Sequence, residues 1–100
     1  MHARVTTLQL QPDRLDQTVS RLEGEDLPSW REIDGFRGFT LFADRSSGKV
    51  IGTSYWDSEE QMRASEEAIR PSRQRAAETG GASSGPEVET FEVALDTFVR

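Results

Sequence analysis

The stretch GFRGFTLFADRSSGKVIGTSYWDSEEQ, residues 35–61, decides the fold. Two runs rich in aromatic and β-branched residues, 36–43 and 49–56, are separated by the polar sequence DRSSG. This composition is typical of two strands joined by a tight turn. Directly after the second run, Ser58 and Gln61 have the spacing of a helix capping box. A hairpin followed at once by a helix is therefore predicted.

The segments before this hairpin predict a strand and a helix. Residues 2–10 carry apolar and β-branched side chains on both alternating faces, which is expected of a central strand covered on two sides. Pro12 suits the first position of a helix. Gly24 and Pro28 interrupt the apolar spacing of this helix, so we expect it to kink or restart near Asp26.

The segments after the hairpin predict a second helix and a fourth strand. The helix is expected to begin near Ser58 and to break at Pro71. The buried side of this helix is expected to hold Met62, Ala64, Ala68 and Ile69. Residues 79–86, TGGASSGP, have the composition of a flexible loop. Alternation over residues 87–95 predicts the last strand.

The order strand-helix-strand, strand-helix-strand predicts a ferredoxin-like α+β fold with a four-stranded antiparallel sheet in a single domain over residues 1–100. Two helices can cover only one face of that sheet. Because the strands carry apolar residues on both faces, the other face would expose an apolar patch. The simplest cover is a second copy of the chain, so a homodimer through the sheet faces is expected.

Composition excludes several classes of function. The net charge of −6 argues against a nucleic-acid partner, which needs clustered Lys and Arg. No apolar run is long enough for a membrane span, so we expect a cytoplasmic protein that does not contact membranes. With one histidine and no cysteine, neither a catalytic triad nor a metal site is expected. His2 itself is expected to be an exposed terminal residue. The acidic residues of the second helix, assigned to a solvated face without catalytic role, are Glu59, Glu60, Glu66 and Glu67.

One stretch has the composition of a ligand site. Gly52, Ser54 and Trp56 project to the same side of one strand, and the two small residues leave space beside the aromatic ring. A large π-surface with an N–H donor suits a flat aromatic ligand. Trp56 would equally suit plain core packing against Met62. We take Thr6 and Met62 as the neighbours of this site.

The chain resembles the antibiotic biosynthesis monooxygenase-like domains of the dimeric α+β barrel superfamily along nearly its whole length. The resemblance rests on the first strand, the Pro-containing first helix, GFRGF at residues 35–39 and YWDSEE at residues 55–60. It implies a homodimer and a small-molecule pocket between sheet and helices, lined by a tryptophan at the position of Trp56. If the protein is an oxygenase, the resemblance implies a reaction that needs no cofactor.

Three positions depart from the pattern of relatives with known chemistry. Thr6 stands where haem-degrading relatives have asparagine, and Ser65 and Glu66 stand in the region of their helix histidine. Gly52 corresponds to an asparagine of the cofactor-independent relatives. We therefore predict a site without cofactor for an aromatic or polyketide-like compound, either in a monooxygenase or in a non-catalytic barrel that binds a metabolite or serves as an assembly module. An RNA-recognition motif shares the element order, but its aromatic segment belongs on the third strand rather than at residues 37–39.

Overall fold

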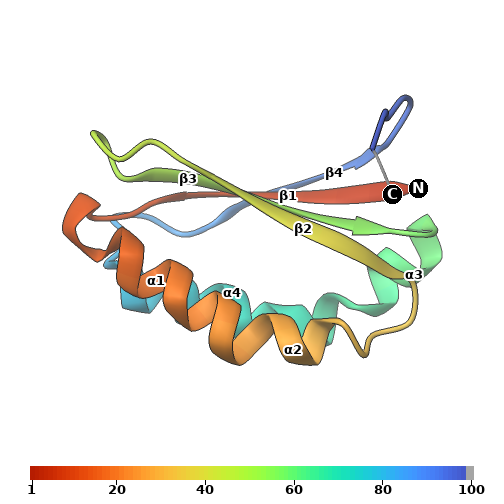
Figure 1. The fold of residues 1–100 in the computed structure, drawn as a ribbon, viewed down its shortest axis with the longest axis horizontal. Helices are drawn as coiled ribbons and strands as arrows, with labels where there is room; N and C mark the ends of the chain where they lie inside the picture. Colours follow the sequence, from red (N-terminus) through yellow and green to blue (C-terminus); the bar gives the residue numbers. More distant parts are fainter. Residues whose placement is uncertain (99–100) are drawn as a thin grey trace.

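The computed structural model describes residues 1–98, which form a four-stranded antiparallel sheet with helices packed on one face (Figure 1). The strands are β1 (His2–Gln9), β2 (Phe36–Ala43), β3 (Lys49–Trp56) and β4 (Glu87–Glu92). Their order across the sheet is β2-β3-β1-β4, and all neighbours are antiparallel. This is the predicted ferredoxin-like α+β fold. The bounds of β2 and β3 agree with the prediction, whereas β4 ends three residues earlier, at Glu92 rather than at residue 95.

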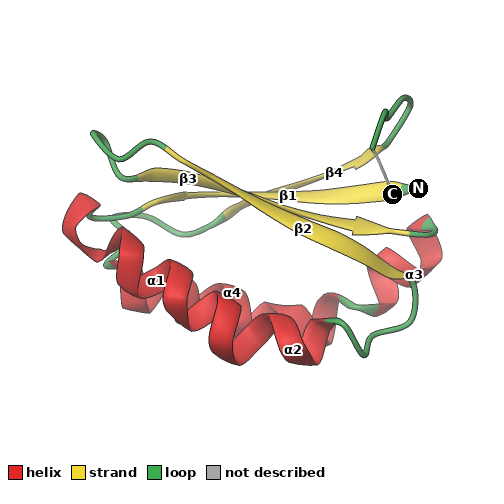
Figure 2. Cartoon of the chain, in the orientation of Figure 1, coloured by secondary structure: helices red, strands yellow, loops and turns green. Residues whose placement is uncertain are grey.

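The helices of the two crossovers lie together on one side of the sheet (Figure 2). The first crossover contains η1 (Pro12–Arg14), α1 (Leu15–Arg21), η2 (Leu22–Asp26) and α2 (Leu27–Trp30). The second contains α3 (Glu59–Ala64) and α4 (Glu66–Gly80). The restart predicted near Asp26 is confirmed, because η2 is a π-helical turn between α1 and α2. A π turn inserts one extra residue per turn and changes which side chains face the sheet.

The predicted break of the second helix at Pro71 is wrong. Pro71 lies inside α4, and the interruption falls at Ser65, between α3 and α4. Pro71 is exposed, so its ring and the carbonyl group that it leaves without an amide partner lie on the solvent side of the helix. The break also rotates the buried face. Ala64 and Ala68 are exposed, contrary to prediction, while Ser65 and Ser72 are buried.

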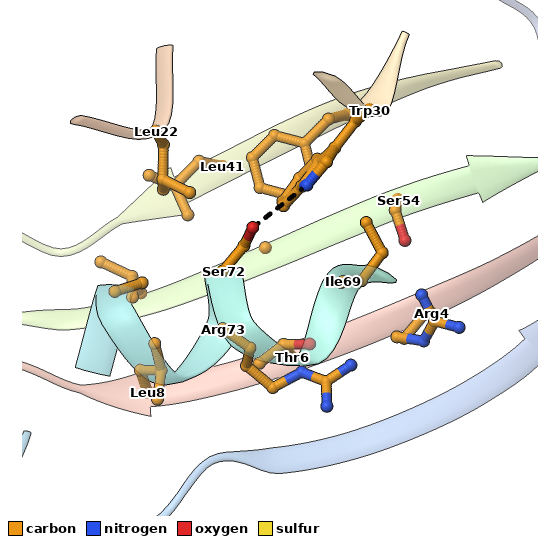
Figure 3. A pocket seen from close by; sticks show the side chains of 14 residues that line it. Arg4, Thr6, Leu8, Leu22, Trp30, Leu41, Ser54, Ile69, Ser72 and Arg73 are labelled. Carbon is orange, nitrogen blue, oxygen red and sulfur yellow. Dashed lines mark hydrogen bonds between the residues drawn. The ribbon is translucent and has the colours of Figure 1, made fainter. Parts of the chain in front are cut away.

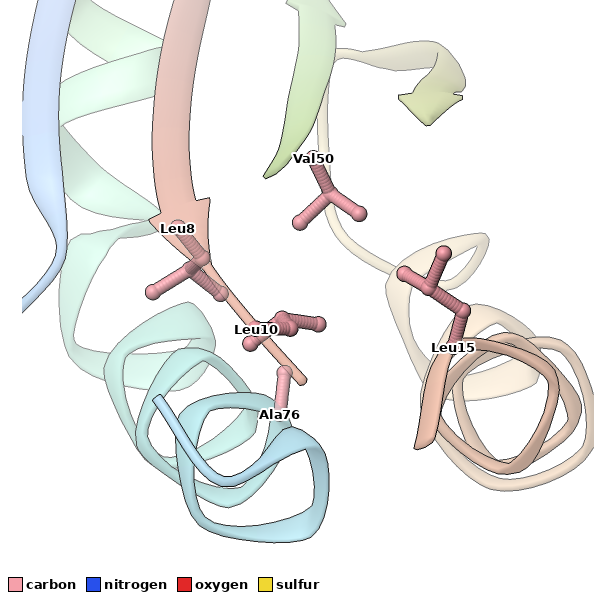
Figure 4. Close-up of a cluster of buried hydrophobic side chains, with 5 residues drawn as sticks. All are labelled: Leu8, Leu10, Leu15, Val50 and Ala76. Carbon is pink, nitrogen blue, oxygen red and sulfur yellow. The ribbon is translucent and has the colours of Figure 1, made fainter. Parts of the chain in front are cut away.

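Two clusters of buried side chains join the sheet to the helices. The first lies below the β1 and β3 ends that adjoin α1 and consists of Leu8, Leu10, Leu15, Val50 and Ala76 (Figure 4). The second lies toward the other end of the sheet and consists of Leu22, Trp30, Trp56, Met62 and Ile69. The space between sheet and helices is thus packed at both ends.

Gly48 closes the turn between β2 and β3 and lies against the backbone of Leu10, a residue of the first cluster. Gly48 has φ of 84°, and its N–H donates to the Asp44 carbonyl at 2.8 Å. A Cβ at Gly48 would lie 2.1 Å from the Leu10 carbonyl oxygen. Only glycine combines this left-handed conformation with so close a backbone approach.

The sheet face opposite the helices carries apolar side chains that no helix of residues 1–98 covers. Phe42 on β2 is 61% exposed and Phe91 on β4 is 50% exposed. Tyr55 on β3 packs edge-to-face against Phe98, with ring centroids 5.3 Å apart. Among the described helices, none is long and apolar enough to span a bilayer.

In the segment 79–86, Thr79 and Gly80 belong to α4, and the rest makes backbone hydrogen bonds to its neighbours. Ser83 N–H donates to the Gln9 carbonyl at 3.1 Å, and Ala82 N–H donates to the Ala77 carbonyl at 2.9 Å. These bonds attach the loop to β1 and to the end of α4. The flexibility expected from its composition stays a prediction.

Candidate functional site

A cavity lies between the helix-facing side of the sheet and the two helical crossovers (Figure 3). Its sheet wall consists of Arg4, Thr6, Leu8, Phe39, Leu41, Val50, Gly52 and Ser54. Its helix wall consists of Leu22, Trp30, Ile69, Ser72, Arg73 and Ala76. The cavity volume is about 50 Å³. This is well below the roughly 300–1,000 Å³ of typical small-molecule sites, so lining side chains must move when a ring system enters.

Three of the five predicted site residues line this cavity. Thr6 lies directly opposite Gly52 in the pairing of β1 with β3, and Ser54 is the next residue of β3 on the same side. A Cβ at Gly52 would lie 3.0 Å from the Phe39 ring. The absence of a side chain at Gly52 therefore lets the Phe39 ring lie against the centre of the sheet wall.

Trp56 and Met62 lie outside the cavity lining. Trp56 has 0% exposure and Met62 has 2%. The Trp56 ring packs edge-to-face against Phe36 at 5.4 Å between centroids. Its indole N–H donates to Ser54 Oγ at 2.9 Å. The structure thus places Trp56 in the core, where it fixes the hydroxyl of a residue that does line the cavity.

Trp30 is the tryptophan on the cavity wall. It packs edge-to-face against Phe39 at 5.2 Å, and its indole N–H donates to Ser72 Oγ at 3.3 Å. Ser72 in turn donates to Asp26 Oδ1 at 3.1 Å. Arg75 donates to the same oxygen at 2.9 Å. This chain of hydrogen bonds holds the Trp30 ring in one orientation and satisfies the buried Asp26 carboxylate.

The sequence contained only a weak signal for Trp30. Its apolar neighbours Leu27 and Ile33 predict a helix with a buried stripe. Trp30 belongs to the second buried cluster, and Leu27 and Ile33 are partly buried and pack against that cluster. The π turn of η2 decides which of these side chains faces the cavity, and no feature of the sequence specified its register.

A cluster of charged side chains forms one end of the cavity. Arg4 on β1 has 4% side-chain exposure, and its Nε lies 3.4 Å from Glu66 Oε1. Arg73 on α4 binds the same carboxylate with both terminal nitrogens, at 2.8 Å to Oε1 and 3.0 Å to Oε2. Arg70 adds a contact of 3.3 Å to Oε2. The prediction that Glu66 belongs to a solvated helix face is therefore wrong. Its carboxylate is the shared partner of three arginines.

These contacts shift the ionisation of the cluster. Hydrogen bonds from Arg73 are the main reason that the pKa of Glu66 falls from 4.5 to about 2, and they outweigh the opposing effect of its partial burial. Burial lowers the pKa of Arg4, while the Glu66 charge opposes that shift. At neutral pH the site therefore contains an ionised Glu66, which is a poor general base.

The remaining candidate residues for acid–base or metal chemistry lie away from the cavity. His2 is half-buried at the start of β1, rather than exposed, and its Nε2 lies 3.4 Å from Glu59 Oε2. Within residues 1–98, no group of three or more His, Cys, Asp or Glu side chains is placed to hold a metal ion. None of the described residues lining the cavity is a His, Cys, Met or Tyr, so the lining offers no axial ligand for haem iron.

Comparison with known proteins identifies the family. The family model described as "Antibiotic biosynthesis monooxygenase" matches residues 1–78. The chain belongs to the antibiotic biosynthesis monooxygenase family. Two uncharacterized proteins of Mycobacterium tuberculosis are 38% identical over 94 residues and 40% identical over 95 residues. The chain spans only 41% and 39% of the length of these relatives, although 94% and 95% of the chain itself is matched.

Several solved structures share the fold. A monooxygenase from the ActVA-Orf6 gene of Streptomyces coelicolor, in complex with nanaomycin D, has a TM-score of 0.79 at 20% identity and covers 99% of this chain and 92% of its own. A variant of SnoaB, a cofactor-independent oxygenase from Streptomyces nogalater, has a TM-score of 0.68 at 14% identity, covering 95% and 94%. A haem degrader from Mycobacterium tuberculosis with two haems in its active site has a TM-score of 0.75 at 20% identity, covering 98% and 100%.

Proposed function

We propose that the cavity between sheet and helices binds a planar aromatic or polyketide-like compound and that the protein acts on it as a cofactor-independent monooxygenase. The observation that carries the proposal is the cavity beside Gly52, which is lined by the Trp30 ring and by apolar side chains of both helical crossovers. Family membership and the fold shared with a monooxygenase that binds nanaomycin D support a ligand of this class.

In such a reaction the substrate supplies the electrons for dioxygen. An electron-rich methylene of a hydroxyaromatic compound becomes a carbonyl, one oxygen atom enters the product, and the other leaves as water. The residues of this chain would orient the ring against Trp30, exclude bulk water and donate hydrogen bonds to developing negative charge. The hydroxyls of Thr6 and Ser54 and the guanidinium groups of Arg4 and Arg73 are the polar groups available for this role.

A non-catalytic binding protein is the second candidate, and one observation favours it. Among the described residues that line the cavity, the charged groups are Arg4 and Arg73, and there is no carboxylate or histidine to serve as general base. A substrate would then have to arrive already ionised. Binding without turnover requires only the apolar walls.

The first prediction concerns Gly52. In a thermal-shift and fluorescence screen of hydroxyquinones, flavonoids, haem and short fatty acids, we expect hydroxyquinones or flavonoids to stabilise the protein and to change its tryptophan emission. Gly52→Val places two methyl groups against Phe39, so it should weaken binding of such a compound at least about tenfold through loss of cavity space. Titration calorimetry measures the change.

Gly24→Val is the matched control, since a Cβ at Gly24 meets no atom within 4 Å. It should leave affinity unchanged. Equal affinity of Gly52→Val and the parent protein would locate the ligand elsewhere. Oxygen uptake with any bound compound then separates the two candidate functions, because uptake supports the monooxygenase and binding without uptake supports the non-catalytic protein.

We also propose that the uncovered sheet face pairs with a second copy of the chain. The face carries Val5, Phe42, Ile51, Tyr55 and Phe91, contributed by all four strands. The same patch used twice about a two-fold axis forms an interface that closes on itself. Resemblance to the dimeric α+β barrel superfamily supports this arrangement.

The second prediction tests this pairing by sedimentation equilibrium at micromolar concentration. The parent protein should have the mass of a dimer, and Phe42→Glu, which places a charge in the apolar patch, should shift the equilibrium to monomer. Val88→Glu is the matched control, because Val88 pairs with Thr6 and lies on the opposite side of the same sheet. A compact monomeric parent protein would exclude the proposed dimer.

A further inference from the structure

Two buried arginines at one end of the cavity have N–H groups without acceptors. The side chains of Arg4 and Arg73 are 4% and 10% exposed. Both line the cavity, and both contact Glu66 Oε1, so their guanidinium groups lie beside each other (Figure 3). Arg4 Nη1 and Arg73 Nε are buried and have no hydrogen-bond partner among residues 1–98.

The carboxylate nearby cannot satisfy these groups as well. Both oxygens of Glu66 already accept two contacts each, Oε1 from Arg4 and Arg73 and Oε2 from Arg73 and Arg70. Arg4 and Arg73 together carry two positive charges against the one negative charge of Glu66. This end of the cavity therefore has an excess positive charge and buried donors, a combination that costs free energy unless an anion completes it.

Other contacts hold the two arginines in place. Arg4 Nη2 donates to the Met62 carbonyl and, at 3.1 Å, to Ser65 Oγ. Its guanidinium carbon lies 5.8 Å from the centre of the Trp56 ring. Arg73 is fixed by its two bonds to Glu66. The donors are thus preorganised, which lowers the entropy lost when an anion binds them.

We propose that Arg4 and Arg73 form an anion subsite, which receives the carboxylate or acidic hydroxyl oxygen of a ligand whose apolar body occupies the rest of the cavity. The proposal rests on the cavity being the ligand site, as proposed above, and it narrows the ligand class to aromatic organic anions. The remainder of the cavity suits the uncharged body, because Leu22, Leu41 and Ile69 line it.

The third prediction uses pairs of probes that have the same shape but different charge. The first pair is 2-naphthoate and the neutral 2-naphthamide. The second is 2-hydroxy-1,4-naphthoquinone, which ionises below neutral pH, and 2-methyl-1,4-naphthoquinone, which does not ionise. Titration calorimetry at neutral pH should show at least one anion binding about tenfold or more tightly than its neutral partner, as charge-assisted hydrogen bonds predict. The pair with the larger ratio distinguishes a carboxylate ligand from an acidic hydroxyl ligand.

Two variants separate this subsite from general electrostatics. Arg73→Gln should reduce the anion preference to about threefold or less, while the neutral probe retains its affinity. Arg70→Gln is the matched control, since Arg70 contacts the same Glu66 but is exposed and does not line the cavity. It removes the same charge and should keep the preference within about twofold of the parent protein.

Each result decides between the proposals. Equal binding of charged and neutral probes by the parent protein overturns the anion subsite and leaves the cavity as a ligand site. Binding of no probe up to about 1 mM overturns both proposals. If Arg73→Gln lowers thermal stability but keeps the full anion preference, Arg73 has only a structural role and the subsite is overturned. The comparison of probes with the parent protein needs no variant, so it stands even if Arg73→Gln fails to fold.

Discussion

Trp56→Ala is expected to lower the free energy of unfolding by about 3–5 kcal/mol, as removal of a buried aromatic side chain from a packed core does. Trp56 has 0% exposure, lies against Phe36 and belongs to the same cluster as Met62 and Ile69. Its removal also leaves the buried Ser54 hydroxyl without its indole donor. The total free energy of unfolding of a protein of this size is about 5–15 kcal/mol. The variant should therefore be only marginally stable. Urea denaturation followed by far-ultraviolet circular dichroism measures the loss.

Trp56→Phe is the control for ring packing, because it retains most of the apolar surface and removes only the N–H bond to Ser54. It should cost about 1–2 kcal/mol. A Trp56→Ala protein with unchanged stability and weakened ligand binding would contradict this account, since that result requires Trp56 to face the cavity rather than the core.

Glu66→Gln is expected to destabilise the protein by about 2–3 kcal/mol, which is less than the roughly 3–5 kcal/mol for breaking a fully buried ion pair, because Glu66 retains 30% side-chain exposure. The loss comes from Arg4 and Arg73, which would keep their buried charges without the neutralising carboxylate. Urea denaturation at neutral pH measures it. Glu67→Gln is the matched control on the next position of α4, where the side chain is exposed, and it should change stability by less than about 0.5 kcal/mol.

The same residue predicts a pH dependence of stability. The pKa of Glu66 is lowered in the folded protein from 4.5 to about 2. The ionised carboxylate therefore stabilises the fold above about pH 4.5, and this contribution is lost as pH falls from 4.5 toward 2. The full pKa shift corresponds to at most about 3 kcal/mol of folding free energy. The contribution is smaller because solvent screens the partly exposed Glu66 carboxylate. Glu66→Gln should lose less stability than the parent protein over this interval, and an identical acid profile of the two would show that Glu66 is not stabilised by its arginines.

The hairpin and the cap after it could be predicted because their determinants are local. Residues 36–43 and 49–56 form strands with the predicted bounds, and Ser58 Oγ accepts from Gln61 N–H at 3.1 Å at the start of α3. The interruption at Ser65 could not be predicted in this way. There the Met62 carbonyl accepts from the Ser65 hydroxyl and from Arg4, which is 58 residues away in sequence.

The cavity was predictable in part for the same reason. Alternation along a strand places Gly52 and Ser54 on one side, and antiparallel pairing brings Thr6 opposite Gly52. Which of the two tryptophans lines the cavity depends on the π turn in η2 and on the packing of Trp56 against Phe36. The arginine cluster depends on β1 and α4 meeting at Glu66. Neither relation is encoded in a short motif, so the sequence alone suggested a solvated Glu66 and no role for Arg4.

The most direct test of the ligand site uses the isoleucine methyl groups as position markers. The chain contains Ile33, Ile51 and Ile69. Ile69 lines the cavity, whereas Ile51 projects from the opposite side of β3 and Ile33 lies outside the lining. With isoleucine methyl groups labelled and a bound hydroxyquinone or naphthoate, the account predicts intermolecular nuclear Overhauser effects from the ligand ring protons to Ile69 and none to Ile51. Contacts to Ile51 without contacts to Ile69 would place the ligand on the outer sheet face and contradict the account.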